Sequence, residues 1–529
     1  MGQPVLTASG TYTLSLKPQN IGTGKLTLTL SNPTVVPELT TTGPTADVTI
    51  DRCGQNAESI FRAAAGDDLS LGFGDNTFTT SLYVTVFAPS GVKVLDDVGL
   101  MSGSTRAFKL PDLPEDGLYR VVIDPYLGAA GTVRLTLSAD VVSALTADGP
   151  AQSAAITRPG QQIRAEFTAP DVKVFGFALT DSTLARSGDA YLVEPAGGEG
   201  TYLGYVSAHS PVAFYITGVT PGTKYAVVIT PDNVATGATK LWLSNPATAG
   251  ELSAAQPSAG GDITRPGQQL EFTYNAAAGD GAAVVFSDST LTELAEVAHW
   301  APGADKDERL GYISDTTFDA ALRAPLVAGT HKVLLQPDEP ATGHVMATLL
   351  PDADGGTLIV DGGRKTASVT TAGQNARYTF TGTKGQKLTL GLDTPPSGWE
   401  LSLWGPDGKW LYDAAYMNDA TVTKALSALP ATGTYTLTVN PSSSGTGTFN
   451  LGLTTTLTAA PASDKDRAST ESDHGGATKT AAASAGILPQ GPDAWQPGKA
   501  NLKGRDWITA RGRTPRPPRN SGLRQAPRP

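Results

Sequence analysis

Aromatic residues gather in one stretch of the chain, and their side chains are the best suited to bind a ligand. Trp404 and Trp410 lie on either side of a GPDG turn, and Tyr412 follows two residues later. Flat aromatic rings can stack on sugars or grip a partner chain, although core packing is the alternative. We take Trp404, Trp410 and Tyr412 as candidate binding residues. The whole cluster comprises Trp399, Trp404, Trp410, Tyr412 and Tyr416.

No catalytic constellation is recognisable. The sequence contains no G-x-S-x-G elbow, P-loop, H-E-x-x-H or G-x-G-x-x-G motif. Glu296 and Asp305 are the acidic candidates for glycosidase chemistry, but the sequence identifies no partner carboxylate for either. We therefore predict that the chain is not an enzyme and uses no cofactor.

The histidines do not have the spacing of metal ligands. His331 stands where other repeats place a strand tyrosine, so we interpret it as a core or corner residue. Calcium binding is an alternative at GDD (66–68) or DADGG (352–356), although neither matches the spaced-ligand loop pattern. We predict no metal site. The five histidines are His209, His299, His331, His344 and His474.

The elements that carry these residues repeat along the chain. A segment that ends in proline occurs five times, and its prolines are 107, 106, 106 and 104 residues apart. A fixed period this long indicates a tandem array. Apolar and polar residues alternate in each segment, which predicts a strand with one buried face. The segments are GTYTLSLKP (10–18), GLYRVVIDP (117–125), GTKYAVVITP (222–231), GTHKVLLQP (329–337) and GTYTLTVNP (433–441).

A second alternating strand follows each segment in constant register. A glycine stands six residues after each closing proline and opens this strand. The pattern of strand, proline, polar loop, glycine and strand predicts an antiparallel hairpin. A Gly-Gln turn begins each unit, with an aromatic residue seven positions after its glycine. The turns are CGQNA (53–57), PGQQI (159–163), PGQQL (266–270) and AGQNA (372–376).

These patterns predict an all-β fold of tandem antiparallel β-sandwich modules, jelly-roll or immunoglobulin-like, each of about 105 residues with seven to nine strands. Residues 1–32 would hold only the last hairpin of an incomplete unit, which we interpret as an upstream truncation or a misplaced start codon. Short linkers predict a semi-rigid rod. The complete units run over residues 33–140, 141–245, 246–351 and 352–457.

Residues 458–529 differ in composition from the repeats. Low hydrophobicity together with Pro, Ser, Gly and Arg predicts a disordered tail. The stretch WQPGKANLKGRDWITAR (495–511) contains two tryptophans and can dock on another domain. Seven arginines and one acid lie in residues 505–529. They can attract nucleic acid or an anionic surface, but we favour a solvated linker.

The charge of the repeats and the single cysteine limit the partners. Residues 1–456 hold 27 basic and 44 acidic side chains, a net charge of −17, which disfavours nucleic acid as a partner. Cys53 has no cysteine partner, and it occupies a turn position that other repeats give to Pro159, Pro266 and Ala372. We interpret it as a passive turn residue. No signal peptide is visible, and no stretch approaches the roughly 18 apolar residues of a membrane span.

The segment LPATGTYTLTV (429–439) and its following strand resemble bacterial pre-peptidase C-terminal-type β-sandwich domains. Tandem units of this type, followed by a W-x-P…N-x-K-G-R-D-W-I-T-x-R stretch, look like the N-terminal region of actinobacterial RHS (YD-repeat) proteins. No YD repeats follow before Pro529. The resemblance implies a secreted or cell-surface protein and no activity for this chain. The matching residues are Trp495, Pro497, Asn501, Lys503, Gly504, Arg505, Asp506, Trp507 and Ile508.

Two functions therefore stay open. The first is a non-catalytic stalk, adhesion or spacer region of a secreted or cell-surface RHS-type protein. Its expected partners are a cell-surface or polysaccharide ligand and downstream domains of the same protein. The second is an accessory region that targets a missing catalytic domain, of a peptidase or a glycoside hydrolase, to its substrate. YD repeats downstream would support the first function, and a hydrolase domain the second.

Overall fold

The computed structural model describes residues 9–15, 24–25, 27–194, 200–304, 307–313, 318–322, 326–393, 399–417, 421–441 and 445–455. These residues form 36 β-strands, one short 3-10 helix and no α-helix. The strands make eight sheets, four of five strands and four of four strands. The predicted all-β class is confirmed for this part of the chain. The predicted disordered tail lies outside the described residues.

The strands fall into four successive groups of nine, which we call repeats 1 to 4. Repeat 1 contains β1 (Thr34–Val35), β2 (Ala46–Ile50), β3 (Ala57–Ala63), β4 (Leu69–Gly74), β5 (Leu82–Phe87), β6 (Lys93–Leu100), β7 (Arg106–Lys109), β8 (Gly117–Pro125), η1 (Tyr126–Gly128) and β9 (Gly131–Ala139). Repeat 2 contains β10 (Val141–Leu145), β11 (Gln152–Ile156), β12 (Ile163–Thr168), β13 (Val174–Thr180), β14 (Gly188–Val193), β15 (Thr201–Val206), β16 (Val212–Thr217), β17 (Lys224–Pro231) and β18 (Gly237–Ser244).

The other two repeats have the same order of elements. Repeat 3 contains β19 (Ala247–Leu252), β20 (Ser258–Ile263), β21 (Leu270–Ala276), β22 (Ala282–Ser287), β23 (Ala295–Trp300), β24 (Glu308–Ile313), β25 (Phe318–Leu322), β26 (Gly329–Pro337) and β27 (Gly343–Pro351). Repeat 4 contains β28 (Ala353–Leu358), β29 (Lys365–Val369), β30 (Ala376–Gly382), β31 (Leu388–Asp393), β32 (Trp399–Trp404), β33 (Trp410–Met417), β34 (Thr421–Ala425), β35 (Gly433–Pro441) and β36 (Gly447–Thr455).

Every repeat pairs a five-stranded sheet with a four-stranded sheet. In repeat 1 the strand orders are β1-β3-β8-β5-β6 and β2-β9-β4-β7, and the other repeats have equivalent orders. The predicted antiparallel hairpin is therefore wrong, because β8 and β9 belong to different sheets. The chain crosses between the sheets after the closing proline. Both strands still turn their apolar faces toward one core, so the alternation is the same as in a hairpin.

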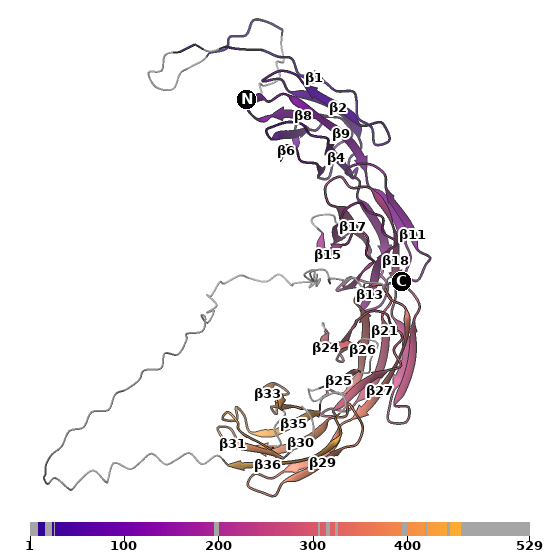
Figure 1. Cartoon of the computed structure of the whole chain (residues 1–529), viewed down its shortest axis with the longest axis vertical. Coiled ribbons are helices and arrows are strands. Elements are labelled where there is room, and N and C mark those ends of the chain that lie inside the picture. Colours follow the sequence, from indigo (N-terminus) through magenta and orange to yellow (C-terminus); the bar gives the residue numbers. More distant parts are fainter. Residues whose placement is uncertain are drawn as a thin grey trace, which may run out of the picture.

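The prediction of discrete, tandem antiparallel β-sandwich modules is also wrong. In each five-stranded sheet, the first strand of the repeat pairs in parallel with the third strand of the repeat, as β1 does with β3, so these sheets are mixed. Successive repeats also form one continuous, curved, solenoid-like stack (Figure 1) rather than separate bodies on linkers. Only one residue separates β9 from β10, and two separate β18 from β19. Strand alternation cannot predict this arrangement, because it reports one buried face and not what lies beyond the sheet.

Each repeat has its own hydrophobic cluster between its two sheets. In β8, the side chains of Tyr119, Val121 and Ile123 are at most 1% exposed, as their alternation predicts. The described parts of residues 9–32 contain no strand, although a hairpin was predicted there. Tyr12 is 54% exposed, whereas its counterpart Tyr119 is buried. The physical reason is that the described residues of this segment join no sheet, so no opposing sheet buries Tyr12.

At the first two joints, a turn of the following repeat inserts into the preceding repeat and locks the joint. At the first joint, the Arg158 guanidinium donates to the carbonyl oxygens of Gly43 and Leu137, the latter at 2.9 Å. The Ser138 hydroxyl donates to the Pro159 carbonyl at 2.8 Å. These side chains satisfy backbone carbonyls that would otherwise be buried without donors. Gly72 allows the close approach, since a Cβ there would lie 2.7 Å from the Pro159 carbonyl oxygen.

The second joint repeats this construction, and the third uses a different one. Arg265 donates to the Gly149 carbonyl, and the Ser244 hydroxyl donates to Pro266 at 3.0 Å. At the third joint, Arg377 pairs with Asp352 at 2.8 Å. Arg377 also donates to the carbonyl of Gly279 in repeat 3, at 2.9 Å. All three joints therefore fix neighbouring repeats through polar contacts at defined positions; the residues they use are Gly43, Leu137, Ser138, Gly149, Arg158, Pro159, Ser244, Arg265, Pro266, Gly279, Asp352 and Arg377.

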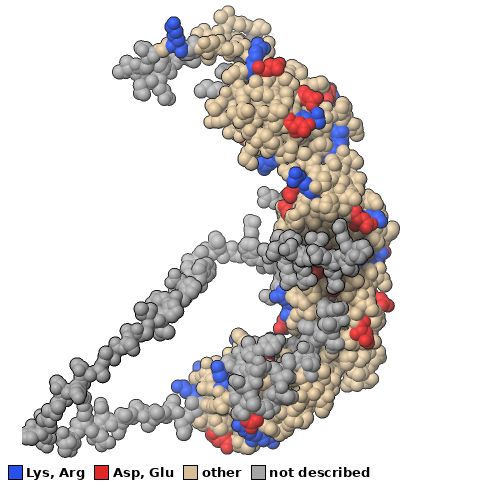
Figure 2. Space-filling model, viewed as in Figure 1, with Lys and Arg blue, Asp and Glu red and all other residues tan. Residues whose placement is uncertain are grey.

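The four repeats describe an arc (Figure 1). The five-stranded sheets, with β6, β15, β24 and β33 at their edges, line its concave side, and the four-stranded sheets lie on the convex side. Figure 2 shows acidic and basic side chains intermixed over the visible described surface. Within the described residues, no helix has the length and apolar character needed to cross a bilayer.

Candidate functional site

Strands β32 and β33 carry the aromatic residues that were predicted to bind a ligand. Trp404 and Trp410 are register partners, so their side chains emerge on one face of the sheet. Leu403 and Trp399 are buried in the core of repeat 4, whereas Trp410 is 56% exposed. Core packing therefore applies to Trp399 and not to Trp410. Tyr412 pairs with Leu403 through its backbone in β33, and its side chain lies outside the described residues.

Trp404 is only partly buried, but its indole nitrogen is enclosed and has no hydrogen-bond partner among the described residues. The structure thus places Trp404 and Trp410 side by side on neighbouring strands. An exposed ring beside a half-buried one forms an apolar platform that can contact the flat face of a ligand.

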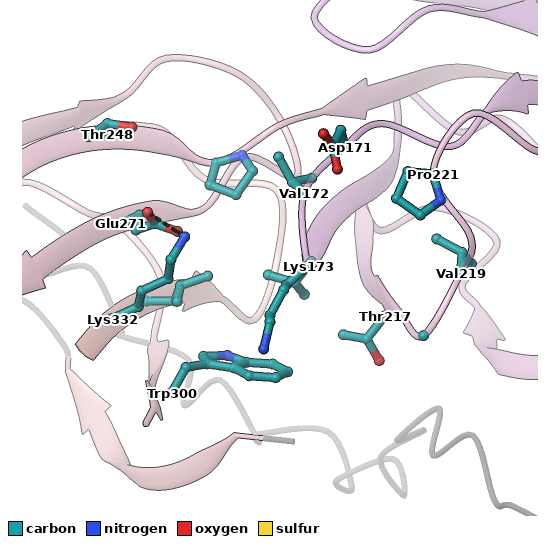
Figure 3. A pocket seen from close by; sticks show the side chains of 14 residues that line it. Asp171, Val172, Lys173, Thr217, Val219, Pro221, Thr248, Glu271, Trp300 and Lys332 are labelled. Carbon is teal, nitrogen blue, oxygen red and sulfur yellow. Dashed lines mark hydrogen bonds and ion pairs between the residues drawn. The ribbon is translucent and has the colours of Figure 1, made fainter. Parts of the chain in front are cut away.

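A second candidate site is a cavity of about 530 Å³ between repeats 2 and 3 (Figure 3). The Lys173 ammonium lies 5.3 Å from the centre of the Trp300 ring, a cation–π contact. The Lys332 ammonium pairs with both carboxylate oxygens of Glu271 at 3.0 Å. Strands from both repeats therefore line this cavity, which exists only because the repeats are packed together.

The floor of the cavity is part of the joint. Val174 of repeat 2 packs with Ala298, Trp300 and Leu334 of repeat 3 in a buried cluster. Across the same joint, Tyr215 donates to the Pro337 carbonyl at 2.6 Å, and burial raises the pKa of Tyr215 well above its ordinary value. Lys173 also donates to the Ala304 carbonyl at 2.7 Å, and Lys332 is paired with Glu271, so the cavity has the features of a binding or joint space.

Sequence reasoning missed Trp300. The signal was present, because Trp300 precedes Pro337 by 37 residues and Trp404 precedes Pro441 by the same 37. Both tryptophans end the equivalent strand, on the face of the five-stranded sheet that points away from its own core. Trp300 is covered because repeat 2 packs against repeat 3 at this position, and the sequence does not show this contact.

Two histidines and a tyrosine form a buried stack in repeat 3. The His299 and His331 rings lie 5.2 Å apart and nearly parallel, and Tyr274 stacks on His331 at 5.0 Å. His299 Nε2 lies 2.9 Å from His331 Nδ1, and His331 Nε2 lies 2.9 Å from the Val327 carbonyl oxygen. Burial lowers the pKa of His331. The interpretation of His331 as a core or corner residue is confirmed, since it is 1% exposed.

Of the two acidic candidates, only Glu296 lies within the described residues. The Tyr312 hydroxyl donates to Glu296 at 3.2 Å, and Arg309 lies 4.0 Å from the same carboxylate. Asp305 lies outside the described residues. Glu296 is therefore placed in a local polar network on β23 and β24.

The acidic loops considered for calcium have protein partners instead. The Asp67 carboxylate accepts the amide of Ala64 at 2.8 Å, and Asp68 pairs with Lys109 at 3.3 Å. Asp352 pairs with Arg377, and burial raises the pKa of Asp352. Across the described ranges, no group of three His, Cys, Asp or Glu side chains is arranged to hold a metal ion.

Comparison with known proteins identifies no family. No protein-family model matches the chain, and no curated protein matches it. A structure of the M60 catalytic domain with two CBM51 domains of ZmpB from Clostridium perfringens is 10% identical, with a TM-score of 0.15 over 75% of this chain. Tripeptidyl peptidase 2 is 9% identical, with a TM-score of 0.15 over 75% of this chain. The alignments span 55% and 33% of those two chains, so this chain matches only part of each.

A structure of Sulfolobus Turreted Icosahedral Virus is 12% identical, with a TM-score of 0.14 over 71% of this chain and 89% of that chain. Overall similarity this low carries no argument about the function of the present chain.

Proposed function

We propose that this chain is a non-catalytic spacer or adhesion region of a secreted or cell-surface protein, of the RHS type that its sequence resembles. The observation that supports the proposal is the construction of the joints. Arg158 and Arg265 each reach from one repeat to backbone carbonyls of the repeat before it. A chain whose joints are locked in this way holds its two ends at a set separation, which is what a spacer does.

The locked joints distinguish this arrangement from repeats on loose linkers. Independent domains on flexible linkers sample many orientations. Here the turns of repeats 2 and 3 fit against small residues of the preceding repeat, Gly72 beside Pro159 and Gly176 beside Gly267. Widening either contact would break the hydrogen bonds of its joint.

Small-angle X-ray scattering of the purified chain tests the proposal. The repeats should scatter as one extended, curved particle. The double variant Arg158→Ala/Arg265→Ala should broaden the distribution of maximum dimensions while keeping the strand content measured by circular dichroism. Arg62→Ala is the matched control, because Arg62 is an exposed arginine whose ion pair with Glu38 stays within repeat 1. A wild-type chain as variable in shape as the double variant would refute the proposal.

A second candidate function is an accessory region that brings a hydrolase to its substrate. The outward-facing Trp410 beside Trp404 favours it, because this platform could hold a polymeric substrate. A fusion of this chain to an unrelated glycoside hydrolase would test it. The fusion should speed hydrolysis of an insoluble substrate and leave the rate on a soluble substrate unchanged. Equal effects on both substrates would rule the targeting function out.

A further inference from the structure

Aromatic residues recur on the edge hairpin of the five-stranded sheet in all four repeats. These hairpins are β5–β6, β14–β15, β23–β24 and β32–β33, and they follow the concave side of the arc (Figure 1). The recurrence is not a product of core packing, because the side chains concerned alternate with the core-facing ones. They are Tyr83 in repeat 1, Tyr191, Tyr202 and Tyr205 in repeat 2, Tyr312 in repeat 3, and Trp404 and Trp410 in repeat 4; Tyr126 of η1 lies beside Tyr83.

Repeat 2 shows the arrangement most fully. Ala190 and Leu192 of β14 are buried, so Tyr191 between them faces away from the core. Tyr202 is the register partner of Tyr191, and the two rings meet edge to face at 5.5 Å. Tyr202 is 42% exposed and Tyr205 is 49% exposed. Three tyrosines thus form an open aromatic surface on one hairpin.

Repeats 1 and 4 carry aromatic side chains on the same hairpin at different register positions, since Tyr83 lies opposite Asp124 and Trp404 lies opposite Thr436. Tyr83 lies between the buried Leu82 and Val84, so it also faces away from its core. Its ring meets that of Tyr126 edge to face at 6.1 Å, and the two residues are 36% and 51% exposed. In repeat 4 the outward ring is Trp410. The same hairpin therefore presents an aromatic surface at both ends of the arc.

Carboxylates accompany these rings. Burial and the nearby Asp189 carboxylate raise the pKa of Tyr202, and the Tyr312 hydroxyl donates to Glu296 at 3.2 Å. In repeat 1 the Thr85 hydroxyl donates to Asp97 at 2.7 Å. Negative charge beside the rings of repeats 1 and 2 repels phosphates and other polyanions, whereas Arg309 lies over the Tyr312 ring and offsets Glu296 there. Carboxylates do suit hydroxyl and ammonium groups, which donate hydrogen bonds to them.

We propose that the concave side of the arc binds an extended polysaccharide chain whose sugars are neutral or carry amino groups. The rings would contact the apolar faces of the sugars, and the carboxylates would accept hydrogen bonds from their hydroxyl or amino groups. A ligand that meets the same hairpin in successive repeats must itself be long and repetitive. Protein partners fit less well, because exposed tyrosines among charged groups form no continuous apolar patch.

This inference rests on the proposed spacer function in one respect, namely that the locked joints hold the hairpins at set distances. Pre-set spacing lowers the entropic cost of engaging several sites at once. Loss of one site should then weaken binding moderately, and loss of two should weaken it much more.

Co-sedimentation of the purified chain with insoluble polysaccharides tests the proposal. The probes are cellulose, which is neutral, and chitosan, which carries amines. Alginate beads and single-stranded DNA on beads serve as polyanions. We expect binding to at least one of the first two and none to the polyanions. Tyr202→Ala/Tyr205→Ala should reduce the affinity by about tenfold, as should Trp410→Ala, and the triple variant by about a hundredfold.

Two controls separate stacking from folding. Tyr202→Phe/Tyr205→Phe keeps the rings and should retain most of the affinity. Ile359→Ala alters a side chain that is 67% exposed in the loop between β28 and β29, away from the hairpins, and should bind like the wild type. Circular dichroism of each variant should match the wild type.

Three outcomes would overturn the proposal. One is failure to bind cellulose and chitosan, and another is equal binding to alginate. The third is an alanine variant that binds as well as Ile359→Ala. Scattering on the same samples keeps the two proposals apart. An intact arc that binds no polysaccharide would reject this inference alone, whereas a chain of variable shape would reject the spacer function.

Discussion

Acidification should destabilise repeat 3, because its core holds His331 where other repeats hold a tyrosine. In repeat 1, the Tyr119 hydroxyl donates to the carbonyl of Glu115, four residues earlier, at 2.7 Å. His331 Nε2 makes the equivalent contact with the Val327 carbonyl at 2.9 Å, so this nitrogen carries the proton. His331 Nδ1 is then free to accept the proton of His299 Nε2 at 2.9 Å. A second proton on His331 would either put two N–H groups against each other inside the core or require His299 to move its own proton to Nδ1.

The direction and size of the effect follow from the pKa of His331. Burial lowers this pKa below its ordinary value near 6.5. Below about pH 6.5 the unfolded chain therefore binds a proton that the folded repeat does not. The free energy of unfolding should fall by about 1.4 kcal/mol for each pH unit of acidification, until the pH reaches the folded pKa. The groups that face the pair are the Tyr274 hydroxyl, 3.2 Å from His299 Nε2, and the Glu308 carboxylate, 3.7 Å from His299 Nδ1.

Hydrogen exchange read by mass spectrometry can measure the effect in β21 and β26 separately from the other repeats. Protection, corrected for intrinsic exchange rates, should decrease between about pH 7 and pH 5 in repeat 3 more than in repeat 2. The variant His331→Tyr/His299→Leu, which installs the residue types of repeat 4, should remove the difference. His209→Tyr, at an exposed position, is the control. Equal pH dependence in the double variant and the wild type would refute the reasoning.

Three further predictions concern the joints and the tryptophans. Gly176→Val should open the second joint, because a Cβ at this position collides with the backbone carbonyl of Gly267 in the turn of repeat 3. Small-angle X-ray scattering should then show a broader range of maximum dimensions, and an unchanged scattering profile would contradict this. Trp399→Ala should lower the free energy of unfolding by about 3–5 kcal/mol, whereas Trp410→Ala should change it by less than about 1 kcal/mol, as read by urea denaturation. Asp352→Ala should cost about 3–5 kcal/mol by the same assay, since it leaves the Arg377 guanidinium without its buried partner; a loss below about 1 kcal/mol would argue against a buried ion pair.

Much of the local structure could be predicted from the sequence. The alternation around Tyr119 and Tyr435 located strands β8 and β35 and their core faces, because a period of two matches the geometry of a strand. That β8 and β9 belong to different sheets, and do not pair with each other, could not be predicted. Two strands that face each other across a core show the same alternation as two neighbours in one sheet. The position of a strand depends on neighbouring residues in the sequence, whereas its pairing partner depends on contacts between distant residues.

The candidate site divides in the same way. The cluster around Trp404 and Trp410 was visible as a run of aromatic residues, and the register of β32 and β33 places the two rings side by side. Trp300 was not predicted as a site residue, because the Lys173 side chain that contacts it lies in another repeat. Nothing in either stretch alone indicates that the two meet.

By itself, the sequence determined the repeat period, the strands and the buried face of each strand, because hydrophobic periodicity acts within a few residues. Tertiary structure alone decided which sheet each strand joined and how the repeats stacked into an arc. It also decided which aromatic residues were covered at joints, like Trp300, and which faced outward, like Trp410. The physical reason is that these outcomes depend on contacts such as Arg158 with Gly43, between residues 115 positions apart. Their free energy arises only when whole repeats come together.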